Sequence, residues 1–165
     1  MNSSIVISQE NLDLIQTEGE AHYPEECCGF LYGTTPPFTG GTKGGREVIE
    51  VHPIRNEQGE NRARRFLISP EQFRRAEAYA NESGFELIGF YHTHPDHPAI
   101  PSEFDREHAL PFYSYVILSV RMGVAAELSS WQLELDRDGY IEEAVQIRVG
   151  AALRGSSQYK AEITK

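Results

Sequence analysis

Short apolar and aromatic segments, separated by clusters of turn residues, recur along the chain and predict β-strands. Apolar and polar side chains alternate in Glu47–Val51, as in a strand with one buried face, whereas Tyr113–Val120 is typical of a central strand. A last pair of strands flanks Asp136–Gly139, which places a glycine in a hairpin turn. The expected strands are residues 5–7, 27–32, 47–51, 66–68, 86–91, 113–120, 131–135 and 141–147.

Three segments carry the signals of a helix start. The clearest is Ser69–Gln72, which combines an N-cap serine, a proline at the first helical position and a glutamine that completes a capping box. Gly84 is expected to cap the other end of that helix, and Leu12 and Ile15 to lie on the inner face of the first helix. The expected helices are residues 8–22, 69–83 and 102–110. Strands interspersed with helices, without an internal repeat, predict an α+β or three-layer α/β/α domain.

The length and composition of the chain suit a single globular domain. We expect this domain at residues 1–150 of the 165, followed by a polar, flexible tail at 151–165. Hydrophobic residues make up 39% of the sequence and charged residues 24%, which is ordinary for a globular protein. No apolar run reaches the length of a membrane span, and the N-terminus lacks the features of a secretory signal. We therefore expect a cytoplasmic protein without a membrane partner.

The net charge and the cysteine content each argue against some partners and some kinds of site. The formal net charge of −10 argues against nucleic acid as a partner, because binding phosphates needs a basic surface. Cys27 and Cys28 are adjacent, so neither a structural disulfide nor a Cys-x-x-Cys motif is expected. Cys28 is interpreted as a small buried hydrophobic residue, with oxidation or metal capture as the alternative. The Gly-rich loop at 39–45 is either a solvated hairpin tip or part of a binding site.

Two histidines and an aspartate follow one another at a spacing that suits a metal site. His92 and His94 end an apolar strand, so their imidazoles would point to the same face, and Pro95 then ends the strand pairing. Ser102 is expected to cap the third helix, with Asp105 in its first turn. Two imidazoles and one carboxylate form a ligand set of catalytic zinc, which leaves a fourth position open.

Each half of this pattern also has a simpler interpretation. The His-x-His pair could be surface or core histidines without a metal. Ser102-x-x-Asp105 is equally a capping box, in which Asp105 need only accept a hydrogen bond from the Ser102 N–H. The zinc hypothesis therefore rests on the two halves occurring together.

The complete spacing resembles the signature of a known family. His92–Pro95, followed after six residues by Ser102–Asp105, is similar to the metal-binding motif of the JAMM (MPN+) metalloproteases. That family also has an upstream glutamate that is not a metal ligand, and Glu26, within Tyr23–Gly33, takes its position. The resemblance covers roughly residues 5–145. It implies a curved, mostly antiparallel sheet flanked by helices, with a cytidine-deaminase-like architecture.

The resemblance also implies a role for each residue of the site. One zinc ion per chain would be held by His92, His94 and Asp105. Glu26 would take a proton from water and return it to the leaving amine, and Ser102 would donate a hydrogen bond to the oxyanion.

Two neighbours of these residues are expected to have lesser roles. Glu25 would point to the face opposite Glu26, since adjacent strand residues alternate, and the spacing favours Glu26 as the catalytic carboxylate. His97 is expected near the metal without binding it, or exposed.

The activity implied is that of a zinc-dependent peptidase or isopeptidase. Pro24–Gly29 resembles the bacterial branch that acts on ubiquitin-like sulfur carriers, in which a cysteine or short tail is released after a C-terminal Gly-Gly. The substrate tail would add as a strand along a sheet edge. The alternatives are an isopeptidase that deconjugates a bacterial ubiquitin-like modifier, a catalytically silent MPN scaffold, and a small-molecule metallohydrolase of another fold.

Overall fold

The computed structural model describes residues 3–36, 45–54, 68–150 and 152–155. The strands in that part of the chain are β1 (Ser4–Ser8), β2 (Cys28–Thr34), β3 (Arg46–Ile54), β4 (Glu86–Pro95), β5 (Ser114–Arg121), β6 (Val124–Leu133), β7 (Tyr140–Val149) and β8 (Ala152–Gly155). The helices are α1 (Gln9–His22), α2 (Pro70–Ser83) and α3 (Glu103–His108). None of these helices is long and apolar enough to cross a lipid bilayer.

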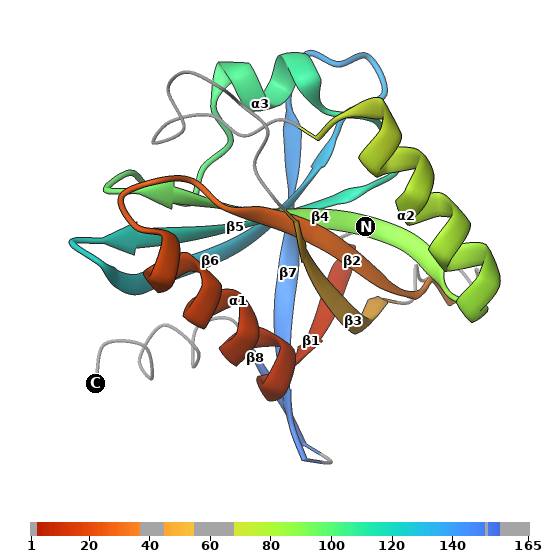
Figure 1. Cartoon of the computed structure of the whole chain (residues 1–165), viewed down its shortest axis with the longest axis horizontal. Coiled ribbons are helices and arrows are strands. Elements are labelled where there is room, and N and C mark those ends of the chain that lie inside the picture. Colours follow the sequence, from red (N-terminus) through yellow and green to blue (C-terminus); the bar gives the residue numbers. More distant parts are fainter. Residues whose placement is uncertain (1–2, 37–44, 55–67, 151, 156–165) are drawn as a thin grey trace.

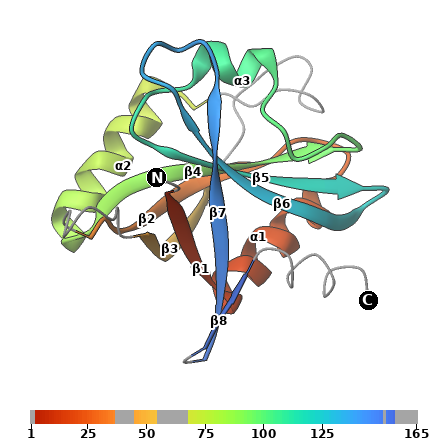
Figure 2. The same ribbon diagram turned by 180° about the vertical axis from the view of Figure 1, so that it is seen from behind.

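The strands form one curved sheet in the order β1-β3-β2-β4-β5-β6-β7-β8 (Figures 1 and 2). Most neighbours are antiparallel, whereas β1–β3, β1–β7 and β4–β5 are parallel. Strand β7 pairs with β6 through residues 140–143 and with β1 through residues 144–148, which brings the two ends of the sheet together. The expected curved, mostly antiparallel sheet is therefore confirmed.

Successive strand residues point to opposite faces of the sheet and build two hydrophobic cores. Tyr91 belongs to the core that contains Leu12 and Ile15 of α1, while its neighbour Phe90 belongs to the core that contains Ala76 of α2. Figures 1 and 2 show α1 on one side of strands β2 and β4, and α2 and α3 on the other. This three-layer arrangement matches the expected α/β/α class and leaves the C-terminal end of β4 between α1 and α3.

Some element boundaries differ from those expected. Helix α3 ends at His108 rather than near Leu110, and β6 begins at Val124 rather than at Trp131. Met122 and Gly123 have φ angles of 50° and 81°, so the chain turns back directly from β5 into β6. A tight turn with methionine at positive φ has no strong sequence signal, which is why the first part of β6 was missed.

The predicted tail differs from the structure, and the predicted strand 66–68 and the Gly-rich loop lie mostly outside the described residues. A polar tail was expected from residue 151, but residues 152–155 form β8, antiparallel to the end of β7, after a turn at Gly150 with φ 61°. Ile68 lies outside any strand. The remainder of the expected strand 66–68, the Gly-rich loop except Gly45, residue 151 and residues 156–165 lie outside the described residues.

Candidate metal centre

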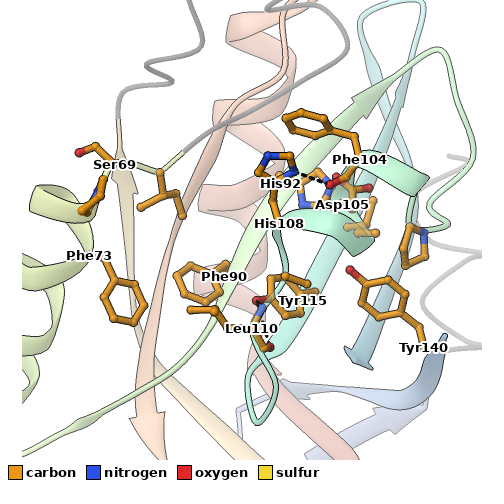
Figure 3. Close-up of a pocket in the computed structure, with 15 residues that line it drawn as sticks. Ser69, Phe73, Phe90, His92, Phe104, Asp105, His108, Leu110, Tyr115 and Tyr140 are labelled. Carbon is orange, nitrogen blue, oxygen red and sulfur yellow. Dashed lines mark hydrogen bonds and ion pairs between the residues drawn. The ribbon is translucent and has the colours of Figure 1, made fainter. Parts of the chain in front are cut away.

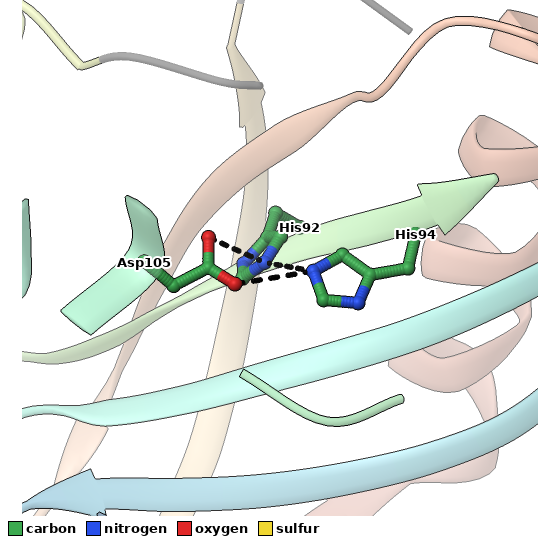
Figure 4. A group of neighbouring side chains, drawn as sticks. All are labelled: His92, His94 and Asp105. Atoms are coloured by element: carbon green, nitrogen blue, oxygen red, sulfur yellow. Dashed lines mark hydrogen bonds and ion pairs between the residues drawn. The ribbon is translucent and has the colours of Figure 1, made fainter. Parts of the chain in front are cut away.

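Two imidazoles face each other at the end of the central strand β4. His92 and His94 are 1% and 6% exposed, and their Nε2 atoms are 3.0 Å apart (Figure 4). Strand β4 is paired with β2 on one side and with β5 on the other, with Cys28 and Ile117 as the partners of His92. Because both neighbours hold the strand, the two side chains are presented from a rigid backbone.

The carboxylate of Asp105 completes the group from the first turn of α3. Its Oδ1 lies 3.4 Å from Nε2 of His92 and its Oδ2 lies 3.2 Å from Nε2 of His94. Ser102 caps the helix and exchanges two hydrogen bonds with Asp105, so the carboxylate is held in one orientation. Two elements that are separate in sequence thus bring three ligand atoms to one point.

The geometry of these atoms fits one zinc ion. Metal–ligand bonds of about 2.0–2.1 Å at tetrahedral angles place ligand atoms roughly 3.4 Å apart, close to the separations of 3.0–3.4 Å between His92, His94 and Asp105. These are the residues in the described part of the chain whose ligand atoms cluster within 4.8 Å. His97 is not among them.

The protonation states of the three residues also fit. Burial lowers the pKa of His92, against the opposing effect of Asp105, so its imidazole stays neutral and can bind a metal. His94 lies with Nδ1 2.8 Å from the carbonyl oxygen of Pro98. Since a carbonyl only accepts, Nδ1 carries the hydrogen, which leaves Nε2 as the nitrogen that can bind a metal. Burial alone would raise the pKa of Asp105, but the two histidines and the Ser102 N–H hold it well below its usual range.

The pairing of β2 with β4 brings Glu26 close to the three ligand residues. Cys28 pairs with His92, and the Thr93 N–H donates to the carbonyl oxygen of Cys27 at 3.0 Å. Glu26 directly precedes Cys27, and its side chain lines one pocket together with His94. Glu26 is 5% exposed, whereas Glu25 is exposed.

Two pockets border the cluster. The first has a volume of about 390 Å³ and is lined by Glu26, His94, His97, Pro98, Ile100 and Ser102. In this pocket Glu26 and Ser102, which the family resemblance implies as catalytic, lie next to the expected ligand His94. Exposed His97 lies on its wall.

The second pocket, of about 360 Å³, is mostly apolar and is lined in part by His92 and Asp105 (Figure 3). Its lining includes Phe73, Phe90, His92, Phe104, Asp105, Tyr115 and Tyr140. These residues come from α2, β4, α3, β5 and β7, so no local pattern groups them, and sequence reasoning missed this pocket.

A three-layer fold around a curved sheet, with a His–His–Asp cluster at the end of its central strand, defines a protein of the JAB/MPN (JAMM) class. The family described as prokaryotic homologs of the JAB domain matches residues 8–134. The chain belongs to this family.

Curated relatives align with part of the chain. A desampylase of Haloferax volcanii is 34% identical over 97 residues, which cover 58% of this chain and 63% of the relative. A desampylase of Pyrococcus furiosus is 33% identical over 82 residues, or 50% of each protein. Tail tip assembly protein K of Escherichia phage N15 is 30% identical over 98 residues, which cover 59% of this chain and 33% of the relative. The chain thus spans less than two thirds of the length of these relatives.

Solved structures match nearly the whole chain. A protein from Salinibacter ruber is 37% identical with a TM-score of 0.63, over 93% of this chain and 95% of that one. Another, from Desulfitobacterium hafniense, is 25% identical with a TM-score of 0.71, over 87% and 92% of the two chains. Both are solution structures, and their likeness supports the fold described above.

Proposed function

We propose that this chain is a zinc-dependent hydrolase that cleaves the amide bond after the C-terminal Gly-Gly of a ubiquitin-like protein. The observation that carries the proposal is that Glu26, His94 and Ser102 line one pocket beside the three-residue ligand cluster. A buried carboxylate and a hydroxyl next to a metal ligand are the groups that amide hydrolysis needs in addition to the metal.

Each side chain of the site has one task in this proposal. His92, His94 and Asp105 would hold one zinc ion, which when bound supplies Lewis acidity to the carbonyl and to water. Glu26 takes a proton from the attacking water and passes it to the leaving nitrogen as the carbon–nitrogen bond breaks. Ser102 Oγ already accepts the Asp105 N–H at 3.1 Å, which fixes the side chain and leaves its own hydrogen for the oxyanion.

The substrate class is supported by the relatives. Two of them are named desampylases, a name for enzymes that remove a ubiquitin-like modifier from its conjugates. We infer that this chain likewise receives the extended C-terminal tail of a ubiquitin-like protein, whose terminal glycines pass closely by the ligand cluster. Backbone hydrogen bonds along a sheet edge would hold such a tail independently of its sequence.

Two leaving groups remain candidates. Pro24–Gly29 resembles the sulfur-carrier-processing branch of the family, for which the leaving group is a cysteine or a short tail. The desampylase relatives instead favour a protein conjugated to the ubiquitin-like modifier as the leaving group. Both reactions use the same residues on the tail side of the bond, so the difference lies in what occupies the leaving-group side.

Metal content and a substrate panel test the proposal. Elemental analysis should find about one zinc per chain in the wild type and none in Asp105→Ala. The panel contains a ubiquitin-like protein extended by a cysteine after Gly-Gly and the same protein joined to a lysine. Wild type should cleave at least one, while Glu26→Gln should retain zinc and lose about 10²–10⁴-fold in rate. A wild type that does not take up added zinc would favour the silent scaffold.

A further inference from the structure

Glu26 lies on a short irregular segment between α1 and β2, and hydrogen bonds attach this segment to the end of β4 on both sides of Glu26. On one side, the Tyr23 hydroxyl donates to Oδ2 of Asp96 at 2.6 Å. On the other, Cys27 N–H donates to Oγ1 of Thr93 at 2.9 Å, and Thr93 N–H donates to the Cys27 carbonyl at 3.0 Å. The two β4-side partners, Thr93 and Asp96, are the residues on either side of His94-Pro95.

Asp96 is itself fixed by the neighbouring hairpin. Its N–H donates to the Val120 carbonyl at 2.7 Å, and its Oδ1 accepts the Met122 N–H at 2.8 Å. One carboxylate oxygen is therefore held by the β5–β6 turn, while the other holds Tyr23. Asp96 also has a φ of 56°, a left-handed conformation in which aspartate is tolerated and most side chains are strained.

We propose that the Tyr23–Asp96 hydrogen bond is a positioning contact that keeps the Glu26 carboxylate at its working distance from the metal ligands. This inference rests on the proposed function, since it concerns the base of that reaction. Neither Tyr23 nor Asp96 lines the two pockets beside the cluster, so neither side chain would touch the substrate. Their effect is on the placement of Glu26, and a displacement of about 1 Å at a reacting group can cost roughly 10²-fold in rate.

The pairing of β2 with β4 explains why the Tyr23–Asp96 hydrogen bond is needed. The β2–β4 ladder begins at Cys28, so Glu26 stands beyond the last strand pair, and the Cys27–Thr93 bonds attach the segment to β4 on that side. The Tyr23–Asp96 bond adds an attachment to the end of β4 on the other side of Glu26. Fewer conformations of the segment then compete with the productive one.

Tyr23→Phe removes the hydroxyl and little else, and the chain offers a matched control. The Tyr79 hydroxyl donates to Oε2 of Glu50 at the same 2.6 Å, and both tyrosines are half-buried, but the second pair joins α2 to β3 away from the site. Tyr23→Phe should lower kcat at least about tenfold with KM and zinc content unchanged, whereas Tyr79→Phe should leave kcat as in the wild type. In a Glu26→Gln background, Tyr23→Phe should cause no further loss.

A second measurement does not depend on activity. Amide hydrogen exchange on the full chain as purified should be faster at residues 25–27 in Tyr23→Phe and unchanged there in Tyr79→Phe. If the wild type cleaves no substrate in the panel, the proposed function is wrong, and exchange at residues 25–27 still tests the contact. If the wild type is active but Tyr23→Phe equals it in kcat and exchange, the positioning role is wrong. Loss of zinc in Tyr23→Phe would also overturn it, because the contact would then serve the ligands.

Discussion

Ser102 and Asp105 exchange two hydrogen bonds at the start of α3: the Ser102 N–H donates to Oδ2 of Asp105 at 2.7 Å, and the Asp105 N–H donates to Oγ of Ser102 at 3.1 Å. The same Oδ2 lies 3.2 Å from Nε2 of His94. From the sequence, Asp105 could have been either a capping residue or a metal ligand. In the structure one carboxylate is placed for both roles, because the cap orients it towards the histidines.

The two roles of Asp105 can be separated by two substitutions. Asp105→Asn keeps an oxygen that can accept the Ser102 N–H but removes the negative charge, whereas Asp105→Ala removes both. We expect both variants to lose zinc by elemental analysis. In urea unfolding of the metal-free proteins, Asp105→Ala should be less stable than Asp105→Asn by about 1 kcal/mol, because it alone loses the cap. Retention of one zinc per chain in Asp105→Asn would contradict the ligand assignment.

Substitution of Ser102 should lower both kcat and the free energy of unfolding. Substitution of Ser8, which caps another helix, shows the effect of a lost cap alone. Ser8 caps α1 by accepting the Asn11 N–H at 3.1 Å. Both Ser102→Ala and Ser8→Ala should lose about 1 kcal/mol of unfolding free energy through the missing cap. Only Ser102→Ala should also lower kcat, by about 10²–10³-fold with zinc retained, because it removes the donor to the oxyanion. Equal kcat values in the two variants would remove Ser102 from the catalytic group.

The adjacent thiols should be chemically inert in the folded protein. Cys27 and Cys28 are 4% and 0% exposed, and burial raises the pKa of Cys27 to about 11 and that of Cys28 further. Because the thiolate is the reactive form, iodoacetamide at pH 8 should modify neither cysteine until the protein is unfolded. Peroxide should likewise leave activity unchanged. Rapid native alkylation of Cys28, with loss of activity, would support the alternative of a redox-sensitive site.

Gly89 is required where β4 approaches β5. A Cβ atom at Gly89 would lie 2.1 Å from the carbonyl oxygen of Ser114, a backbone atom that cannot move alone. Gly89→Ala should therefore push the two strands apart, lower the free energy of unfolding by about 1–3 kcal/mol and weaken zinc binding, since β4 carries both histidines. At Gly139 the nearest atom is a flexible Glu134 side-chain oxygen, at 3.3 Å. Gly139→Ala should be nearly neutral in both measurements.

The sequence was sufficient for the features that depend on local geometry. Alternation along a strand placed His92 and His94 on one face, and the N-cap pattern placed Asp105 in the first turn of a helix. The capping box of α2 at Ser69 and its left-handed Gly84 cap were predicted for the same reason and are present. Such features need only the backbone of their own element, so a short stretch of sequence determines them.

The tertiary structure decided which of these elements meet. Glu26 lines one pocket with His94 because β2 and β4 pair in one register among many that are locally acceptable. The Tyr23–Asp96 contact and the apolar pocket arise in the same way, from segments distant in sequence. The register is chosen by the summed burial of side chains on both faces of the sheet, and that free energy belongs to the whole fold and to no single segment.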